Sequence, residues 1–147
     1  MAKWTIKPFS ELSAPEVYQI LGLRSEVFVV EQNCVYQDID GKDFKALHLI
    51  GRSDNEIVAY ARLFDIGIYF PEASIGRVAI KLSYRGKHLG HELMKEAIEG
   101  IKKHFDQSSI TISAQLYLKK FYESHGFIQI GESYLEDGIP HIRMEKK

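Results

Sequence analysis

The stretch VAIKLSYRGKHLGHEL, residues 78–93, changes from one kind of secondary structure to another along its length. It opens with β-branched and apolar residues typical of a buried strand, and from Leu89 onward its apolar residues recur at helical spacing. The short passage between the two patterns holds a glycine and three basic side chains: Arg85, Gly86, Lys87 and His88. The sequence therefore predicts a strand, a glycine-bearing turn and a helix in direct succession.

Such a turn can bind an anion through its backbone. The first turn of a helix leaves N–H groups unpaired and carries the positive end of the helix dipole. A glycine ahead of it lets phosphate oxygens approach these amides, so the site needs no net positive charge on the protein. We expect Gly86 and Gly90 to keep the turn open, and Arg85, Lys87 and His88 to neutralise phosphates from its rim. Because many strand–helix turns hold a glycine and a basic residue, a solvent-exposed connection is an equal alternative on this stretch alone.

The rest of the chain predicts one α/β domain spanning residues 1–147. Helical apolar spacing indicates helices over 89–105 and 115–124, and an earlier stretch over 15–28 that forms either one long helix or two short ones. The strand, helix and strand over 75–113 form a crossover, which places its two strands in parallel. Alternating or continuous apolar patterns predict seven strands, at 3–9, 46–52, 56–64, 73–80, 108–114, 127–134 and 139–146.

Composition and charge exclude several classes of function. The chain carries 19 Lys and Arg residues against 20 Asp and Glu, so its net charge of −1 gives no global field toward nucleic acid or an anionic membrane. No run approaches the roughly 18 apolar residues of a membrane span, and the first residues lack the apolar stretch of a signal peptide. Cys34 is the only cysteine, which excludes an internal disulfide and a Cys-based zinc cluster. We therefore expect a cytoplasmic protein that uses no nucleic acid, membrane or metal.

The stretch NCVYQDIDGKDFK, residues 33–45, lacks a steady period and carries Asp38, Asp40 and Asp43 around Gly41. Calcium is the first ligand to test against such a cluster, but the stretch lacks the final glutamate and the full oxygen-ligand pattern of an EF-hand loop. We interpret it as a solvent-exposed acidic turn, which would at most attract a cationic substrate.

A second stretch, YLKKFYESHGF at residues 117–127, follows the next predicted strand. Together, the two stretches resemble the GNAT N-acetyltransferase superfamily, whose phosphate loop reads Gln/Arg-x-x-Gly-x-Gly/Ala and whose later helix reads Phe/Leu-Tyr-Glu-x-x-Gly-Phe. Here these motifs are RGKHLG at 85–90 and FYESHGF at 121–127, and the resemblance covers roughly residue 46 to the end. One position departs from the pattern: His88 stands where the family has its first glycine, and we expect it to adopt a helical φ.

Two further stretches narrow the resemblance. RSEVFVVEQNCVYQDIDGKD at 24–43 and EDGIPHIRM at 136–144 are similar to the ElaA-like branch of these enzymes. The spacing Arg24-x-x-x-Phe28 also resembles, more distantly, the acyl-homoserine-lactone synthases that share the fold. The resemblance implies a single GNAT domain, in which a mixed, mostly antiparallel sheet of about seven strands with a parallel central pair is flanked by helices.

The resemblance also implies that acetyl-CoA lies between two splayed parallel strands as co-substrate. Its pantetheine arm would pair with the backbone of Val78 and Ile80, with Ala79 between them, and an amide near Val78 would polarise the acetyl carbonyl. Dimers are common in the family, so a homodimer is a further expectation. The phosphates would rest on the loop and first helical turn formed by Arg85, Gly86, Lys87, His88, Leu89, Gly90 and His91.

Attack of an amine on a thioester needs an acid for the leaving thiolate and a base for the amine. Tyr122 matches the tyrosine that often serves as this acid in the family, with simple packing under the sheet as the alternative. For the base three candidates stay open, Glu31, His48 and His141, and for each the plainer explanation is a surface or hydrogen-bonded residue. His48 alternates with its leucine neighbours along a predicted strand, which points it toward solvent or a cleft.

Arg24 and Arg77 could orient an acidic group on the acceptor, with ordinary salt bridges as the simpler explanation for both. We expect an acetyl-CoA-dependent N-acyltransferase that moves an acetyl group to an unidentified primary amine by direct attack in a ternary complex. Two alternatives stay open: a catalytically weak acyl-CoA-binding sensor or subunit, and an acyltransferase like the homoserine-lactone synthases. Tyr122 counts against a sensor, because a protein that only binds needs no acid beside the sulfur.

Overall fold

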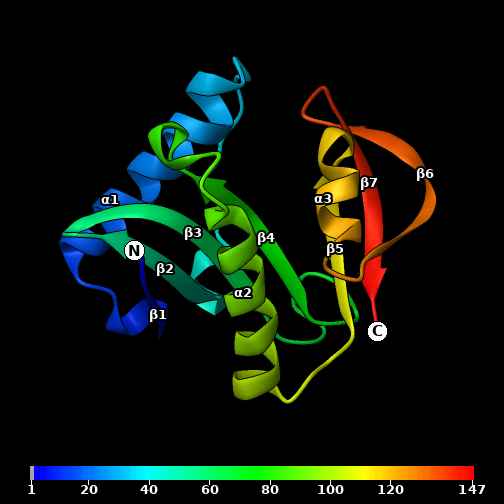
Figure 1. Cartoon of the computed structure of the whole chain (residues 1–147), viewed down its shortest axis with the longest axis horizontal. Coiled ribbons are helices and arrows are strands. Elements are labelled where there is room, and N and C mark those ends of the chain that lie inside the picture. The colour runs from blue at the N-terminus through cyan, green and yellow to red at the C-terminus, as the bar shows by residue number, and fades with distance from the viewer. Residues whose placement is uncertain (1) are drawn as a thin grey trace.

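Residues 2–147 are described by a computed structural model, in which seven strands form two sheets (Figure 1). The first sheet is antiparallel throughout and has the strand order β1–β2–β3–β4. Helices cover both of its faces, so the strand at its centre is almost wholly buried, as its apolar sequence requires. The strands of this sheet are β1 (Lys3–Pro8), β2 (Leu47–Ser53), β3 (Glu56–Phe64) and β4 (Ser74–Ile80).

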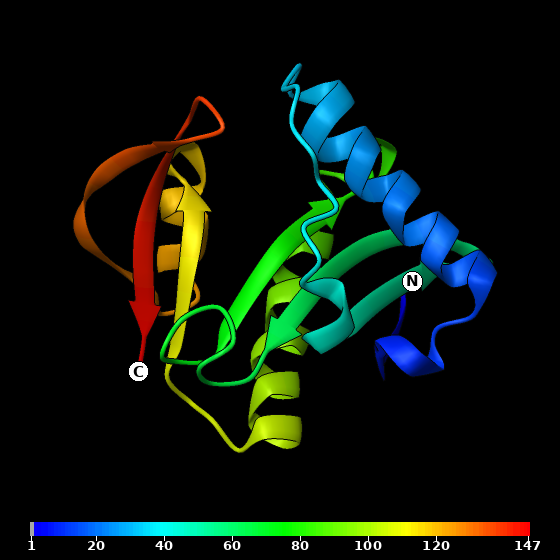
Figure 2. The ribbon, with the colours of Figure 1, turned by 180° about the vertical axis from the view of Figure 1, so that it is seen from behind.

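The second sheet has the order β5–β7–β6 and is also antiparallel. Within the described chain, a single parallel bridge joins the sheets, where the amide of Thr111 donates to the carbonyl of Ala73 at 2.9 Å. Beyond it β4 and β5 diverge, and the two sheets form the arms of a V (Figure 2). The mixed, mostly antiparallel α/β fold is confirmed, and the predicted parallel pair consists of this one bridge. The strands are β5 (Ile110–Gln115), β6 (Ile128–Glu136) and β7 (Ile139–Lys146).

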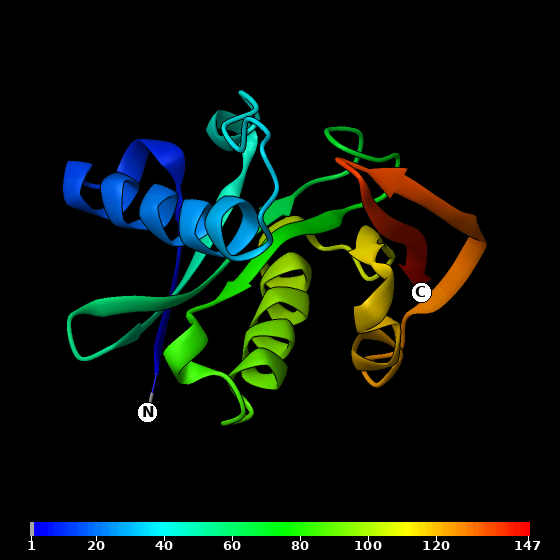
Figure 3. The ribbon, with the colours of Figure 1, turned by 90° about the horizontal axis from the view of Figure 1, so that it is seen from above.

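Helices α1 (Ala14–Arg24) and α2 (Leu89–Phe105) lie on opposite faces of the first sheet (Figure 3). α1 begins at a capping box, in which the Ser13 hydroxyl accepts from the Glu16 amide and the Glu16 carboxylate accepts from the Ser13 amide. It continues without a break into a π-helical segment, Ser25–Glu31. The early predicted helix is therefore one continuous helix whose last turns are π-helical, a form that occurs frequently at functional sites.

Close packing fixes α2 against the first sheet. Gly100 permits this approach, because a Cβ atom there would lie 2.7 Å from Cδ1 of Ile6. Each fully buried large apolar side chain contributes about 1.5–3 kcal/mol. The first turn of α2 is thereby held in place at the end of β4. Four α2 residues have no exposed surface: Leu93, Met94, Ala97 and Ile101.

The short helix α3 (Lys119–Glu123) lies against the second sheet, on the same side of the molecule as α2 (Figures 1 and 3). Across residues 2–147, the helices are too short or too polar to cross a membrane. The remaining connections include 3₁₀ turns at Phe9–Glu11, Asp43–Lys45, Leu82–Tyr84 and Leu116–Leu118.

Candidate active site

A cavity of about 580 Å³ lies between the sheets, where β4 and β5 diverge. Its walls come from β4, the loop before α2, the first turn of α2, β5, α3, β7 and the π-helical segment. Three of the predicted site residues, Ala79, Lys87 and His48, do not line it. The others converge on it: Glu31, Val78, Ile80, Arg85, Gly86, His88, Leu89, Gly90, His91, Tyr122 and His141.

β4 offers an open edge to this cavity. Its other edge pairs with β3, but the register skips between Gly76 and Ala79, so Arg77 and Val78 together face a single residue of β3. Arg77 has a φ of +50° at this bulge. Because β5 bridges to the chain only just before β4 within the described residues, the rest of this edge has no strand partner. An open edge of this kind can pair with an extended, amide-bearing ligand.

The turn before α2 presents unpaired amides. Within residues 2–147, none of the N–H groups of Gly86–His91 donates to a backbone carbonyl. Gly86 has a φ of +78°, and His88, the N-cap of α2, has a φ of +61°. The expectation of a helical φ for His88 is therefore wrong. The chain enters α2 through a left-handed residue, which is the conformation that glycine adopts most easily and explains the glycine in the family pattern.

Arg85 is turned toward β4 and the π-helical segment. Its Nε and Nη2 donate to the carbonyl of Ile80 at 3.0 and 2.9 Å. Its Nη1 and Nη2 donate to the two carboxylate oxygens of Glu31 at 2.5 and 2.8 Å. The two side chains are 36 % and 31 % exposed, so solvent weakens this ion pair. In this state Arg85 occupies both a candidate base and a carbonyl of the open strand.

Tyr122, on α3, is buried and lines the cavity. Its ring packs edge-on against Phe121 and Phe127, at centroid distances of 5.2 and 6.0 Å. Its hydroxyl forms no hydrogen bond to any described residue, so it is available to a ligand in the cavity. Burial raises the pKa of Tyr122 above its ordinary value, and the phenol therefore keeps its proton at neutral pH.

His141, on β7, is buried and lines the same cavity. Its Nδ1–H donates to the carbonyl of Ile139 at 2.7 Å, which leaves Nε2 as the acceptor nitrogen of a neutral ring. The carboxylate of Glu136 lies 3.5 Å from Nε2. The hydrogen bond to Ile139 therefore holds the ring in one tautomer.

His48 lies away from this cavity and is not placed to act as a base there. It lines a second, smaller cavity of about 150 Å³ beside α1, in agreement with the expectation that it faces solvent or a cleft. It is 1 % exposed, because the 3₁₀ turn that begins at Asp43 covers it. Its Nε2–H donates to the carbonyl of Asp43 at 2.9 Å, and its Nδ1 accepts from the hydroxyl of Tyr60 at 2.6 Å. Burial lowers the pKa of His48, so the ring stays neutral. With both nitrogens occupied, His48 is a structural histidine.

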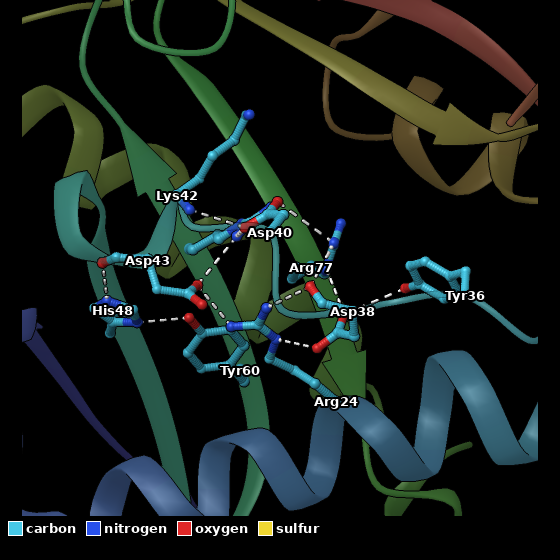
Figure 4. A network of polar contacts seen from close by, with 10 residues as sticks. Arg24, Tyr36, Asp38, Asp40, Lys42, Asp43, His48, Tyr60 and Arg77 are labelled. Carbon is cyan, nitrogen blue, oxygen red and sulfur yellow. Dashed lines mark hydrogen bonds and ion pairs between the residues drawn. The ribbon is translucent and has the colours of Figure 1, made fainter. Parts of the chain in front are cut away.

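The stretch 33–45 is also different from its expected form. Instead of a solvent-exposed acidic turn, it folds its carboxylates inward onto three arginines (Figure 4). Asp38 and Asp43 are each only 8 % exposed. The salt bridges given as the simpler explanation for Arg24 and Arg77 are confirmed. The pairs are Arg24–Asp38 at 2.8 Å, Arg24–Asp43 at 2.7 Å, Arg62–Asp40 at 2.5 Å, Arg62–Asp43 at 3.0 Å and Arg77–Asp38 at 2.7 Å.

Arg62 is the member of this cluster that the sequence interpretation missed. It is 1 % exposed on β3, the strand EIVAYARLF. The available signal was its charge within an otherwise apolar stretch, because a buried guanidinium requires a carboxylate partner. Burial alone would raise the pKa of Asp43, but the hydrogen bond and charge of Arg24, with those of Arg62, hold it below its ordinary value. Asp43 therefore stays ionised at neutral pH.

In the described part of the chain, no group of three or more His, Cys, Asp or Glu side chains is arranged to hold a metal ion. The polar groups that line the cavity include backbone amides, the phenol of Tyr122 and the imidazole of His141.

Comparison with known proteins shows the family to which the chain belongs. Residues 10–147 match the family model described as an acetyltransferase (GNAT) domain. The chain is 42% identical to Protein ElaA of Escherichia coli K12 over 149 aligned residues, which span 100% of this chain and 97% of that one. The crystal structure of Escherichia coli ElaA matches with a TM-score of 0.93 and covers 100% of both chains.

Two further solved structures extend the comparison. An acyl-CoA N-acyltransferase from Pseudomonas aeruginosa shares 40% identity, with a TM-score of 0.93 over 100% of both chains. A GNAT family acetyltransferase from Elizabethkingia anophelis, solved with acetyl-CoA bound, shares the fold alone, at 16% identity and a TM-score of 0.66 over 98% of this chain and 97% of that one. By its sequence and its fold, the chain belongs to the GNAT acetyltransferase family, in the branch that contains ElaA.

Proposed function

We propose that this protein is an N-acetyltransferase that moves the acetyl group of acetyl-CoA to a primary amine by direct attack in a ternary complex. One observation carries the proposal: a single cavity joins the unpaired amides at the start of α2, the open edge of β4 and the hydroxyl of Tyr122. These three features correspond to the three parts of acetyl-CoA, which are its phosphates, its amide-bearing arm and its thioester.

The nucleotide end of acetyl-CoA would be held mainly by the backbone. The amides of Gly86–His91 would supply the donors, and the dipole of α2 would add to the attraction. Lys87 would neutralise the phosphates from the rim, while Arg85 stays paired with Glu31 in the wall of the same cavity. The pantetheine amides would pair with the open edge at Val78–Ile80, where Ala79 keeps its side chain in the core behind the strand.

In the proposed reaction, the amine nitrogen bonds to the acetyl carbon while the carbon–sulfur bond breaks. The peptide N–H near Val78 would stabilise the negative charge that develops on the acetyl oxygen. Tyr122 would give its proton to the sulfur, whose thiol has a pKa near the cysteine value of about 8.5. His141 would take a proton from the amine. We assign the base to His141 rather than Glu31, because both oxygens of Glu31 accept hydrogen bonds from Arg85.

The acceptor side of the cavity favours an amine with an apolar body. The π-helical segment contributes Val27 and Phe28 to the wall. The three aspartates of the 33–45 stretch, once candidates to attract a cation, are occupied by buried arginines. Glu31 is likewise neutralised by Arg85. Charge on the protein therefore gives little attraction to a polycationic acceptor.

The test combines calorimetry on acetyl-CoA with a screen of primary amines that follows release of free thiol. In the wild type we expect binding and turnover. Tyr122→Phe should lower kcat about 100-fold or more, the size of a general acid contribution, while the Kd for acetyl-CoA changes less than about twofold. Tyr18→Phe is the matched control, because Tyr18 is an exposed tyrosine on α1, 82 % accessible. If Tyr122→Phe weakens acetyl-CoA binding as much as it lowers kcat, Tyr122 contributes only to packing.

The same screen separates the alternatives. Binding without turnover of any amine would favour an acyl-CoA sensor, and a preference for long acyl chains would favour an acyltransferase like the lactone synthases. If calorimetry with millimolar acetyl-CoA gives no heat of binding, the acetyltransferase and both alternatives are excluded. The homodimer and the cytoplasmic location belong to this proposal, and size-exclusion chromatography with light scattering tests the first of them.

A further inference from the structure

The bulge of β4 contains a residue in a disfavoured backbone conformation. Arg77 has a φ of +50° and lines the cavity. An L-residue with a Cβ atom is destabilised in the left-handed region, so the surrounding structure must hold it there. On one side the bulge leaves Arg77 and Val78 opposite a single residue of β3, and on the other it faces the cavity.

The side chain of Arg77 donates two hydrogen bonds to the 33–45 stretch (Figure 4). Its Nε donates to Oδ1 of Asp38 at 2.7 Å, and its Nη2 donates to the main-chain carbonyl of the same residue at 3.0 Å. Oδ2 of Asp40 lies 3.5 Å from Nη2. Two parallel contacts to one residue fix the direction of the guanidinium as well as its distance.

Asp38 cannot follow Arg77 if the strand relaxes, because a second arginine holds it. Nε of Arg24 donates to Oδ2 of Asp38 at 2.8 Å, and its Nη2 donates to the carbonyl of Asp38 at 3.2 Å. The side chains of Arg24 and Asp38 are 0 % and 8 % exposed, so solvent does little to screen this pair. Arg77 is thus bonded to an anchor that is itself fixed in the core.

We propose that Arg77 is a positioning residue, whose two-point contact with Asp38 holds the left-handed turn that aims the Val78 peptide at the acetyl carbonyl. The inference rests on the proposed function, since it assigns the carbonyl of acetyl-CoA to this peptide. The new element is that the direction of the Val78 N–H depends on the contact between Arg77 and Asp38, a residue outside the cavity. Loss of that contact should misdirect the peptide without removing the phosphate site at the start of α2.

The test follows the carbonyl stretching band of acetyl-CoA carrying a ¹³C label in its acetyl group, by difference infrared spectroscopy. In the wild type the band should move to lower frequency on binding, because a hydrogen bond polarises the carbonyl. In Arg77→Ala most of this shift should disappear and kcat should fall about tenfold or more. The Kd for acetyl-CoA should change less than about twofold.

Arg77→Gly is the decisive companion variant. It also lacks the contact with Asp38, but glycine adopts the left-handed region freely, so part of the band shift and of kcat should return relative to Arg77→Ala. Arg77→Lys, which keeps the charge without the two-point contact, should lie between wild type and Arg77→Ala, and serves if the alanine variant does not fold. Arg52→Ala removes a strand arginine that pairs with Glu16 away from the cavity and should leave the band unchanged.

The outcomes separate the two proposals. If wild type binds acetyl-CoA and acetylates an amine but all three Arg77 variants keep the wild-type band and kcat, only the positioning role is wrong. If glycine is no better than alanine while thermal stability falls equally in both, Arg77 serves stability alone and the proposal is overturned. If wild type shows no binding of acetyl-CoA, the proposed function fails and the positioning role fails with it.

Discussion

Two polar loops flank the cavity, and they use their charges in opposite ways. The loop 36–43 turns its carboxylates inward, where Asp38 and Asp43 are 8 % exposed and bonded to arginines (Figure 4). The loop 82–91 leaves the backbone amides of Gly86–His91 unpaired, and its basic side chains lie at the surface or over neighbouring groups. In the first loop, charged side chains form the electrostatic interactions, and the backbone conformation depends on them. In the second the backbone itself forms the site.

The difference has a physical cause in solvent access. A buried ion pair is not screened, and removing one partner leaves an uncompensated charge in a medium that solvates it poorly. Charges at the surface are screened by water and salt and contribute little individually. We therefore expect substitutions in the first region to act on the free energy of unfolding, and those in the second to act on affinity for acetyl-CoA.

The largest expected effect is that of Arg24→Ala. Arg24 is fully buried and donates to Asp38 and Asp43, so its removal takes a cation away from two buried carboxylates. We expect the free energy of unfolding to fall by about 3–5 kcal/mol, the usual cost of breaking a buried pair. Urea denaturation followed by circular dichroism measures the change.

Arg52→Ala provides the comparison for that measurement. Arg52 is 25 % exposed and pairs with Glu16, which keeps Lys7 as a second cation. The expected loss is about 1 kcal/mol or less. If Arg24→Ala costs no more than Arg52→Ala, the contrast between a buried ion cluster and a surface pair does not govern stability here.

How well the sequence predicts each of these two regions depends on how far apart in the chain the interacting residues lie. The succession of strand, turn and helix at 78–93 was predicted from the sequence because the three are adjacent in the chain, and their geometry is local. The ion cluster joins residues 14 to 39 positions apart, which no local pattern reports. From the sequence alone, a run of aspartates is interpreted as solvent-exposed, because nothing in it shows that arginines from other elements pair with it.

Two finer errors have the same origin. His48 was a candidate base, but it lines a second cavity under the 3₁₀ turn at Asp43 rather than the one between the sheets, which depends on tertiary packing. The left-handed φ of His88 is set by how β4 and α2 are joined in space. The family pattern had already indicated it, because a glycine at that position in relatives is the usual sign of a positive φ.

Gly86→Val should give the next largest effect, and it acts on the other region. A Cβ at Gly86 meets no atom within 4 Å, so the cost comes only from its φ of +78°. An L-residue pays about 1–2 kcal/mol in this conformation, and the loop would relax to avoid it. We expect the Kd for acetyl-CoA to rise about tenfold, with the free energy of unfolding nearly unchanged. Isothermal titration calorimetry measures the first and urea denaturation the second.

Gly90→Ala distinguishes backbone conformation from clearance. A Cβ there would lie 3.5 Å from the ring of Phe121, an ordinary contact, and the residue has no positive φ. Its effect on Kd should stay below about twofold. A loss as large as that of Gly86→Val would mean that space above the amides, rather than the left-handed turn, limits binding, as the sequence pattern alone had suggested for both glycines.

The smallest expected effect is that of Glu31→Gln. This substitution removes an ion pair from the region where backbone amides form the proposed site. Glu31 holds Arg85 away from the amides of the phosphate loop, and the pair is partly exposed. Exposed pairs of this kind are worth about 0.2–1 kcal/mol, so releasing Arg85 should tighten acetyl-CoA binding by roughly 1.5- to 5-fold. The gain should shrink as salt is raised from 0.05 to 0.5 M, values chosen to shorten the Debye length from well above to well below roughly 10 Å.

Glu26→Gln removes a carboxylate from the same π-helical segment and is the control for general charge effects. Equal tightening in both variants would show that the phosphates respond to the overall field and that the Glu31–Arg85 contact has no specific part. Weaker binding in Glu31→Gln would mean that the contact orders the loop for its ligand instead of competing with it. That second result would make the two loops alike, because a side-chain ion pair would then shape the phosphate site as Asp38 shapes the bulge of β4.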